Sequence, residues 1–241
     1  MHEEERRRLA IEAAEKLKER VDREIAKLVM TLSDGIKSSF HLLAGGGEGP
    51  YFVDFDYIVE EPSNCKLIAE KFSERIQEIS SYREKKPDLL GFIEKDRAIG
   101  TIGALLLAGY VSSLTEIPFI LIRHTRELPY AKLKISEQFK VEDRQRLKGK
   151  NVLIISDVST TGSEIKEAIK IVKNNRGNVT DVLLYYSRSP KEVVEDLQSM
   201  GVTMHYLLNE SQTRYFVAHP EFKEGDKSIK IQRVLAEVGR Y

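Results

Sequence analysis

A short run of small, mostly hydroxyl-bearing residues, 159–163, has the features of a phosphate site. It reads Ser-Thr-Thr-Gly-Ser, and it lies between an aliphatic run (152–155) and a segment whose apolar residues have helical spacing. The first N–H groups of a helix have no partner within it, and the helix dipole adds partial positive charge there. Gly162 lets the backbone approach a ligand closely, and the hydroxyls can donate to phosphate oxygens. This order of elements predicts a site for a sugar phosphate.

One carboxylate, Asp157, comes directly before this turn. A carboxylate would repel the phosphate itself, so Asp157 is better explained as an acceptor for sugar hydroxyls or as an indirect partner of a metal ion. An alternative is that the hydroxyl residues only cap the helix, which small residues of this kind often do.

The elements that must hold this turn form an alternating series. The aliphatic run 152–155 is typical of a strand buried on both faces of a parallel sheet. We expect four further strands, at 88–93, 118–123, 178–187 and 202–208. Helices are expected at 63–80, 98–111 (nearly all apolar and buried against the sheet), 190–200 and 228–238. Strands that alternate with helices predict an α/β fold with a parallel sheet and right-handed crossovers.

Composition limits the classes of function. The chain has 241 residues, with 38 basic and 38 acidic side chains, so its balanced charge gives no clear nucleic-acid site. Its only cysteine, Cys65, cannot form an internal disulfide and fits a reducing compartment. The five histidines lack metal-ligand spacing, and no apolar run is long enough to span a membrane. We therefore expect a cytoplasmic protein without a membrane partner.

The strand, Asp157 and the turn together resemble the motif that binds PRPP (5-phosphoribosyl 1-pyrophosphate) in type I phosphoribosyltransferases. The match includes Thr160, Thr161 and Gly162, with Ser163 as a conservative replacement, whereas Ser156 stands where the family usually has an acid. The resemblance implies a Rossmann-like fold: a central parallel sheet flanked by helices, with a small N-terminal hood and helical extensions. It also implies that Val158 to Ser163 bind the phosphate of PRPP.

A glycine-rich segment, residues 40–54, resembles the N-terminal motif of orotate phosphoribosyltransferases. The matching residues are Phe40, Leu42, Gly45, Pro50, Tyr51, Phe52 and Asp54. The resemblance implies a hood in which Tyr51 and Phe52 contact the base. The lysine of that motif is replaced by Leu43 or Ala44, and neither can donate to a carboxylate. An ordinary β-turn connection is the alternative for this segment.

Two charged segments follow predicted strands. Residues 94–97 (Glu-Lys-Asp-Arg) lie at a carboxyl end, where ligands bind in open α/β sheets, although such a loop is often only a solvated turn. The resemblance implies that Lys95 contacts pyrophosphate. Arg123 matches the start of the family's catalytic loop, within a polar stretch that runs to residue 150. The loop's usual lysine and histidine are replaced by Glu127 and Pro129, so Lys132 or Lys134 is a candidate substitute.

The chain divides into three parts by pattern. Residues 1–38 form a helical extension with an apolar stripe, which either lies over the core or packs against a second subunit. Residues 39–208 form the phosphoribosyltransferase-like domain, including the hood at 39–60, and residues 209–241 form a C-terminal extension. The family resemblance implies a homodimer.

The implied reaction joins a nucleobase to ribose 5-phosphate and releases pyrophosphate from PRPP. Asp157, Lys95 and Arg123 are the implied catalytic residues, and Mg²⁺ is expected to bind through PRPP rather than through dedicated protein ligands. The alternative is a regulatory protein that binds PRPP or a nucleotide and has lost the reaction, because Ser156, Leu43 and the altered loop depart from the pattern of the enzymes.

Overall fold

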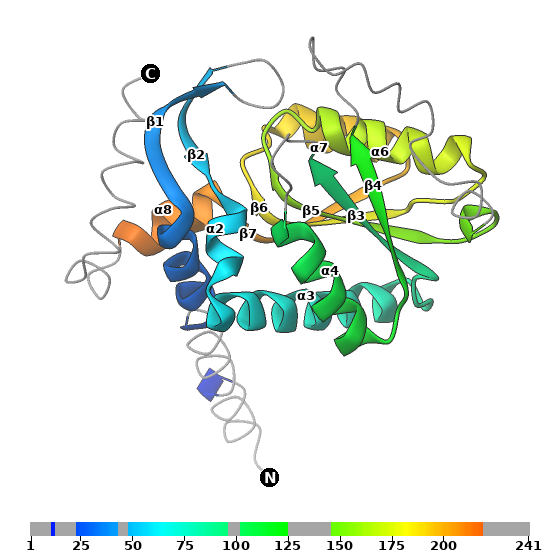
Figure 1. Cartoon of the computed structure of the whole chain (residues 1–241), viewed down its shortest axis with the longest axis horizontal. Coiled ribbons are helices and arrows are strands. Elements are labelled where there is room, and N and C mark those ends of the chain that lie inside the picture. Colours follow the sequence, from blue (N-terminus) through cyan, green and yellow to red (C-terminus); the bar gives the residue numbers. More distant parts are fainter. Residues whose placement is uncertain (1–10, 13–22, 43–47, 96–101, 125–145, 219–241) are drawn as a thin grey trace.

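The chain folds around a five-stranded parallel sheet with the strand order β4-β3-β5-β6-β7. The computed structural model describes residues 11–12, 23–42, 48–95, 102–124 and 146–218. The strands are β3 (Leu89–Lys95), β4 (Phe119–His124), β5 (Val152–Ser159), β6 (Asp181–Ser187) and β7 (Thr203–Asn209). All five carboxyl ends lie at one edge of the sheet (Figure 1), so the predicted α/β architecture is confirmed.

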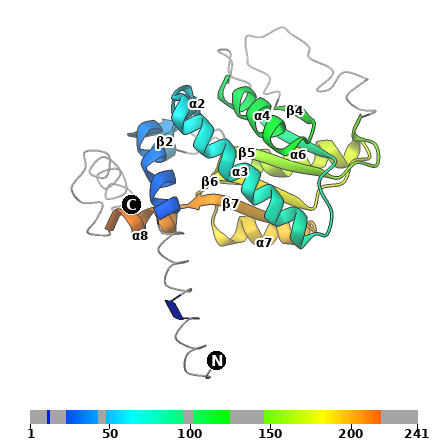
Figure 2. The ribbon, with the colours of Figure 1, turned by 90° about the horizontal axis from the view of Figure 1, so that it is seen from below.

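Helices cover both faces of the sheet (Figures 1 and 2). On one face lie α3 (Pro62–Tyr82) and α4 (Ile102–Thr115), and on the other lie α6 (Ser163–Asn174) and α7 (Lys191–Ser199). The central strands are aliphatic on both sides because each face is buried: all residues of β6 are buried, and so are Val152 to Ser156 of β5. The last helix within the described residues, α8 (Glu210–Ala218), follows β7 directly.

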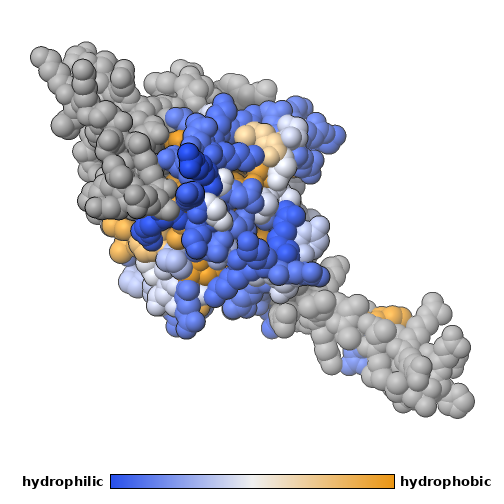
Figure 3. All heavy atoms as spheres, turned by 90° about the vertical axis from the view of Figure 1, so that its right-hand side faces the viewer, coloured by the Kyte–Doolittle hydropathy of each residue, from blue (hydrophilic) through white to orange (hydrophobic). Residues whose placement is uncertain are grey.

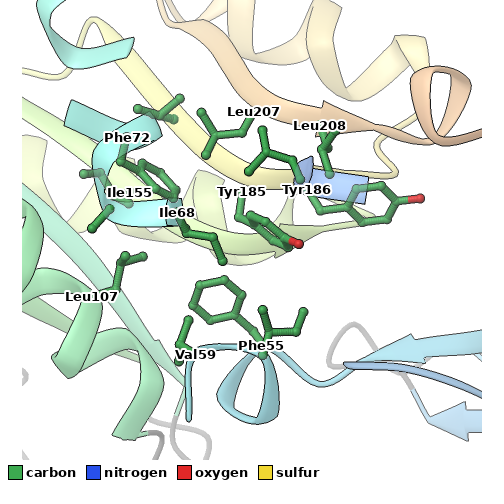
Figure 4. Packing of buried hydrophobic residues seen from close by; sticks show 14 of the residues in the cluster. Phe55, Val59, Ile68, Phe72, Leu107, Ile155, Tyr185, Tyr186, Leu207 and Leu208 are labelled. Atoms are coloured by element: carbon green, nitrogen blue, oxygen red, sulfur yellow. The ribbon is translucent and has the colours of Figure 1, made fainter. Parts of the chain in front are cut away.

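The hood is a separate antiparallel hairpin of β1 (Ile36–Leu42) and β2 (Glu48–Val53). A helix over residues 23–35 precedes it, and the short α2 (Phe55–Glu60) follows it. Leu28, Val29 and Leu32 are buried, so this part of the N-terminal stripe packs on the core. At the base of the hood, Phe55 and Val59 point toward Tyr185 of β6 (Figure 4), and the Phe55 and Tyr185 rings lie 5.2 Å apart.

Two details differ from the predictions. β5 extends past the predicted aliphatic run 152–155 to Ser159, because residues 158 and 159 still pair with β6. α4 is not fully buried: it covers the sheet with Leu107, Ala108 and Val111, but Leu105, Leu106, Tyr110 and Leu114 are exposed.

Some predictions lie outside the described residues, namely most of the N-terminal helix, the glycine-rich loop at 43–47, the loop at 125–145 and the helix at 228–238. The proposed domain boundaries stay predictions. Seen from the side away from the hairpin, the described surface is mostly hydrophilic (Figure 3).

Candidate functional site

The predicted phosphate turn connects β5 to α6 at the carboxyl edge of the sheet (Figure 1). Gly162 is the N-cap of α6 and has φ 68° and ψ 4°, in the left-handed region. As a glycine it has no side chain to cap the helix. The hydroxyl residues Thr161 and Ser163 lie on either side of it, next to the first turn of α6. Thr161 Oγ1 and Ser163 Oγ are 3.0 Å apart, and both residues are exposed. The turn therefore presents hydroxyls and a helix N-terminus at the surface, as a phosphate site requires.

Only glycine fits at position 162, for two independent reasons. A left-handed conformation is costly for residues with a Cβ atom. In addition, a Cβ atom built on Gly162 would overlap Cγ1 of Val193, which belongs to α7. The close packing of α7 behind the turn thus fixes the turn's backbone.

The Asp157 carboxylate forms hydrogen bonds with the residues on either side of it in β5. Its Oδ1 accepts a hydrogen bond from the backbone N–H of Val158 at 2.6 Å, and the Ser156 hydroxyl lies 3.3 Å from the same oxygen. Asp157, Val158 and Thr160 are half-buried, whereas Ser156 and Ser159 are buried. Asp157 is thus held at the edge of the turn with its carboxylate oriented by local donors.

Lys95 and Arg123 end neighbouring strands. β3 lies between β4 and β5, with Glu94 opposite Arg123 and Lys95 opposite His124. The backbone thus places both predicted residues at the carboxyl edge that carries Asp157. Their side chains lie outside the described part of the structure.

The structure adds a residue that the sequence reasoning missed, Arg188, which follows β6. Its backbone N–H donates to the Ser159 carbonyl oxygen at 2.8 Å, and its Nη1 donates to the Tyr51 carbonyl oxygen at 3.1 Å. Its Nε is buried and is the only such side-chain atom without a hydrogen-bond partner among the described residues. Its position after a predicted strand, at the ligand-binding edge of the sheet, was the signal that could have identified it.

The hood residue Tyr51 is buried rather than open to a ligand. The Arg188 guanidinium lies 3.7 Å from the centroid of its ring, and the Tyr51 and Tyr186 hydroxyls are 3.1 Å apart. Burial raises the pKa of Tyr51, so the phenol stays protonated. Phe52 pairs with Lys37 in the hairpin, and its side chain lies outside the described part.

The described residues contain no group of three or more His, Cys, Asp or Glu side chains placed to hold a metal ion. Among the same residues, no helix has both the length and the apolar character needed to cross a membrane.

Comparisons with known proteins place the chain near one family. Residues 62–210 match the sequence model of a family described as the phosphoribosyl transferase domain. The orotate phosphoribosyltransferase of Pyrococcus abyssi is 26% identical over 186 residues, which cover 77% of this chain and 91% of that protein.

Two solved structures share the fold. The UMP synthase of Leishmania donovani superposes with a TM-score of 0.60 at 21% identity; the match covers 89% of this chain but only 42% of that longer chain. The orotate phosphoribosyltransferase of Aeropyrum pernix gives a TM-score of 0.55 at 17% identity, covering 76% of this chain and 92% of the other.

Proposed function

This chain belongs to the phosphoribosyltransferase domain family, and on that premise we propose that it joins a nucleobase to ribose 5-phosphate, with PRPP as the donor. The observation that supports the proposal is the β5–α6 turn, where a left-handed Gly162 is flanked by the exposed hydroxyls of Thr161 and Ser163 at the start of α6. The relatives named orotate phosphoribosyltransferase favour an orotate-type acceptor.

Each residue at the carboxyl edge has a proposed role. The turn from Val158 to Ser163 holds the 5′-phosphate, and Asp157 accepts hydrogen bonds from the ribose hydroxyls. A nitrogen of the base displaces pyrophosphate at C1 of the ribose, so negative charge collects on the leaving group while positive charge develops on the sugar. Lys95 and Arg123, on adjacent strands, supply positive charge to the leaving group.

Mg²⁺ fits this site as a partner of PRPP. A magnesium ion usually keeps several waters and binds through substrate phosphates with one or two carboxylates. The half-buried Asp157 beside the turn fits that mode as a carboxylate near the substrate phosphates. When bound, the ion neutralises charge on the pyrophosphate.

Base contact is proposed for the hood. Tyr51 can offer its ring to a base only if the Arg188 guanidinium moves aside, since that group now covers the ring. Phe52, the next residue of β2, is the other proposed contact.

The chain is further proposed to be a cytoplasmic homodimer. The single cysteine, Cys65, is buried and fits a reducing compartment. α4 has no charged residue, and four of its large apolar side chains are exposed: Leu105, Leu106, Tyr110 and Leu114. An uncharged apolar stripe of this kind suits a second copy of the same helix.

The decisive experiment is an assay of pyrophosphate release from PRPP and Mg²⁺ with a panel of bases that includes orotate. We expect release with at least one pyrimidine base, and its loss in the Asp157→Asn variant. Tight PRPP binding without release for any base would instead indicate a regulatory protein. The departures from the enzymes' pattern at Ser156 and Leu43 would then explain the lost reaction.

A further inference from the structure

The edge of the sheet opposite the proposed site carries a cluster of positive charge. The segment before β5 (residues 146–151) and the segment that ends α6 (residues 173–179) together contain five basic side chains and no acidic one. All five are exposed: Arg146, Lys148, Lys150, Lys173 and Arg176. These five residues form what we call the basic edge. The total charge of the chain is balanced, but its distribution over the surface is uneven.

Backbone hydrogen bonds hold the two segments side by side. The N–H of Gly149 donates to the Arg176 carbonyl oxygen at 2.9 Å, and the N–H of Asn178 donates to the Lys150 carbonyl oxygen at 2.8 Å. A Cβ atom added to Gly149 would meet nothing within 4 Å, so the first turn projects from the surface. This edge is on the side of the molecule that Figure 3 shows, where the described surface is mostly hydrophilic.

The basic edge extends across the sheet. At one end, Arg146 Nη2 donates to the Phe119 carbonyl oxygen at 3.4 Å, at the start of β4. At the other end, Lys173 Nζ donates to the Met200 carbonyl oxygen at 3.1 Å, shortly before β7. Four strand spacings separate β4 from β7, so the row of charges is on the order of 19 Å long. A duplex carries one phosphate charge per about 1.7 Å of its axis, so a row of this length can contact several phosphates.

Nearby carboxylates do not neutralise the basic edge. Asp88 accepts a hydrogen bond from the backbone N–H of residue 151, and Asp181 is held in its salt bridge to the end of α3. Within the described residues, Lys148, Lys150 and Arg176 form no ion pair with a carboxylate. On the adjoining turns, two exposed acids are offset by two exposed lysines: Glu84, Glu116, Lys85 and Lys86. The positive charge of the row is therefore available to a partner.

The chemistry of the row favours the backbone of a nucleic-acid duplex. Lysine and arginine side chains, with amides such as that of the exposed Asn174, are groups that contact phosphate and sugar. Leu147 and Val179, the apolar residues of the two segments, are buried, so the row offers no apolar anchor to a membrane and no apolar core to a protein partner. It also contains no aromatic ring on which the bases of a single strand could stack.

We propose that the basic edge binds the phosphate backbone of double-stranded nucleic acid without reading its sequence. Such contacts are electrostatic, so the affinity is modest and falls steeply with salt. The proposal does not rest on the proposed reaction, because the basic edge lies at the amino ends of the strands and the phosphate turn at their carboxyl ends. Duplex RNA and duplex DNA share this chemistry, and the experiment distinguishes them.

Fluorescence anisotropy with the full chain tests the proposal. The probes are one RNA and one DNA duplex of the same sequence, of about 20 base pairs and therefore longer than the row. Neither carries terminal phosphates, which could otherwise enter the phosphate turn. Between about 50 and about 200 mM NaCl, the logarithm of the association constant should fall with the logarithm of the salt concentration with a slope of about −2.5 to −4.5, because each neutralised phosphate contributes about −0.9.

A triple variant removes the centre of the row. Lys148→Gln, Lys150→Gln and Arg176→Gln together should weaken binding by about tenfold or more at about 50 mM salt and make the slope less negative by about 2.7. Lys148→Arg with Lys150→Arg keeps the charge and should keep the slope. Urea denaturation verifies that the variants are folded.

A second triple variant is the matched control, because it removes the same formal charge from ion pairs on α3 and α7: Lys66→Gln, Arg75→Gln and Lys191→Gln. Its slope should stay within about 0.5 of the unaltered chain's. Equal losses in the two triple variants would show that binding follows net charge, and would overturn the basic edge as the site. Absence of binding to either duplex would also overturn it.

The remaining outcomes identify the partner. Equal affinities for the two duplexes would support recognition of backbone charge alone, whereas a preference for one would assign RNA or DNA through duplex shape. Tighter binding of a labelled oligoglutamate peptide or of phosphatidylserine vesicles would assign a different partner and overturn the proposal. Failure of the unaltered chain to bind PRPP would count against the proposed function only.

Discussion

Arg83 and Asp181 form a bidentate salt bridge that joins the end of α3 to the start of β6. Nε and Nη2 of Arg83 each lie 2.9 Å from a different oxygen of the Asp181 carboxylate. His205 Nε2 lies 2.8 Å from the same carboxylate, and the Thr180 hydroxyl donates to it at 2.8 Å. Asp181 is buried, so these partners replace the water that its charge has lost. The cluster stabilises the amino-terminal edge of the sheet, opposite the proposed site.

Replacing Asp181 should destabilise the fold without affecting the site. Asp181→Asn leaves Arg83 without its charge partner, and loss of one member of a buried pair typically costs about 3–5 kcal/mol. Because Arg83 is partly exposed, we expect about 2–3 kcal/mol, measured by urea denaturation. Glu195→Gln, in the exposed Lys191–Glu195 pair, is the control and should cost less than about 0.5 kcal/mol. Equal effects of the two variants would contradict the structural role of Asp181.

The Asp181 carboxylate should also make the folded protein less stable in acid. Burial alone would raise the pKa of Asp181, but hydrogen bonds with His205, Arg83 and Thr180 outweigh burial and lower the pKa to about 2. A carboxylate with a lowered pKa stabilises the fold above its ordinary pKa of 3.8, and that contribution is lost as the pH falls from 3.8 toward 2.

Ionised Asp181 contributes about 2 kcal/mol to the free energy of unfolding. The unfolding free energy, measured between pH 5 and pH 2.5, should therefore fall more steeply in the unaltered chain than in Asp181→Asn. Parallel pH profiles would show that Asp181 is not the group responsible.

Gly162→Ala should damage the turn more than conformational strain alone predicts. A left-handed alanine costs about 1–2 kcal/mol, and here its Cβ atom also overlaps Val193. We expect PRPP affinity to fall by about tenfold or more, measured by calorimetry. Gly201→Ala is the matched control, since Gly201 has φ 75° but nothing within 4 Å of an added Cβ atom.

A second substitution distinguishes the backbone strain of a left-handed alanine from the overlap of its Cβ atom with Val193. Val193→Ala provides space behind the turn, so Gly162→Ala in that background should regain part of its affinity. If the Val193→Ala background gives no recovery, the overlap with α7 is not what fixes the turn.

Much of the scaffold could be predicted from the sequence because its signals are local. The aliphatic run 152–155, followed by small polar residues and helical spacing, specifies a strand, a turn and a helix. The strand order of the sheet depends on packing between distant segments, and no local signal in the sequence predicted it. The extension of β5 to Ser159 was missed because polar residues read as a strand end, although they still pair with β6.

The contacts of Tyr51 and Arg188 could not be predicted from the sequence for a related reason. Tyr51 matches a hood motif, but its burial depends on Tyr186 and Arg188, which are more than 130 residues away in the chain. The exposed face of α4 was also missed, because an almost wholly apolar helix reads as buried on all sides. In each case the outcome depends on which distant neighbours cover a residue.

Asp157→Asn should weaken PRPP binding while leaving the fold intact. If the carboxylate accepts hydrogen bonds from the ribose, its loss costs about 1.5–3 kcal/mol, or about tenfold to a hundredfold in affinity. Calorimetry measures the affinity, and urea denaturation should show a change within about 0.5 kcal/mol. Glu164→Gln is the control, because it removes a charge from the first turn of α6 and should not weaken binding. Unchanged affinity in Asp157→Asn would exclude Asp157 as the ribose ligand.

A charge placed on α4 should separate the proposed dimer. Leu106 is 48% exposed, so Leu106→Glu leaves the core intact but buries a carboxylate if two copies of this helix pack together. Sedimentation velocity at micromolar concentration should show a dimer for the unaltered chain and a monomer for this variant. Tyr82→Glu introduces the same charge at a residue that is 76% exposed on α3, and it should leave the dimer in place. Dissociation by both variants, or by neither, would mean that the exposed stripe of α4 is not the interface.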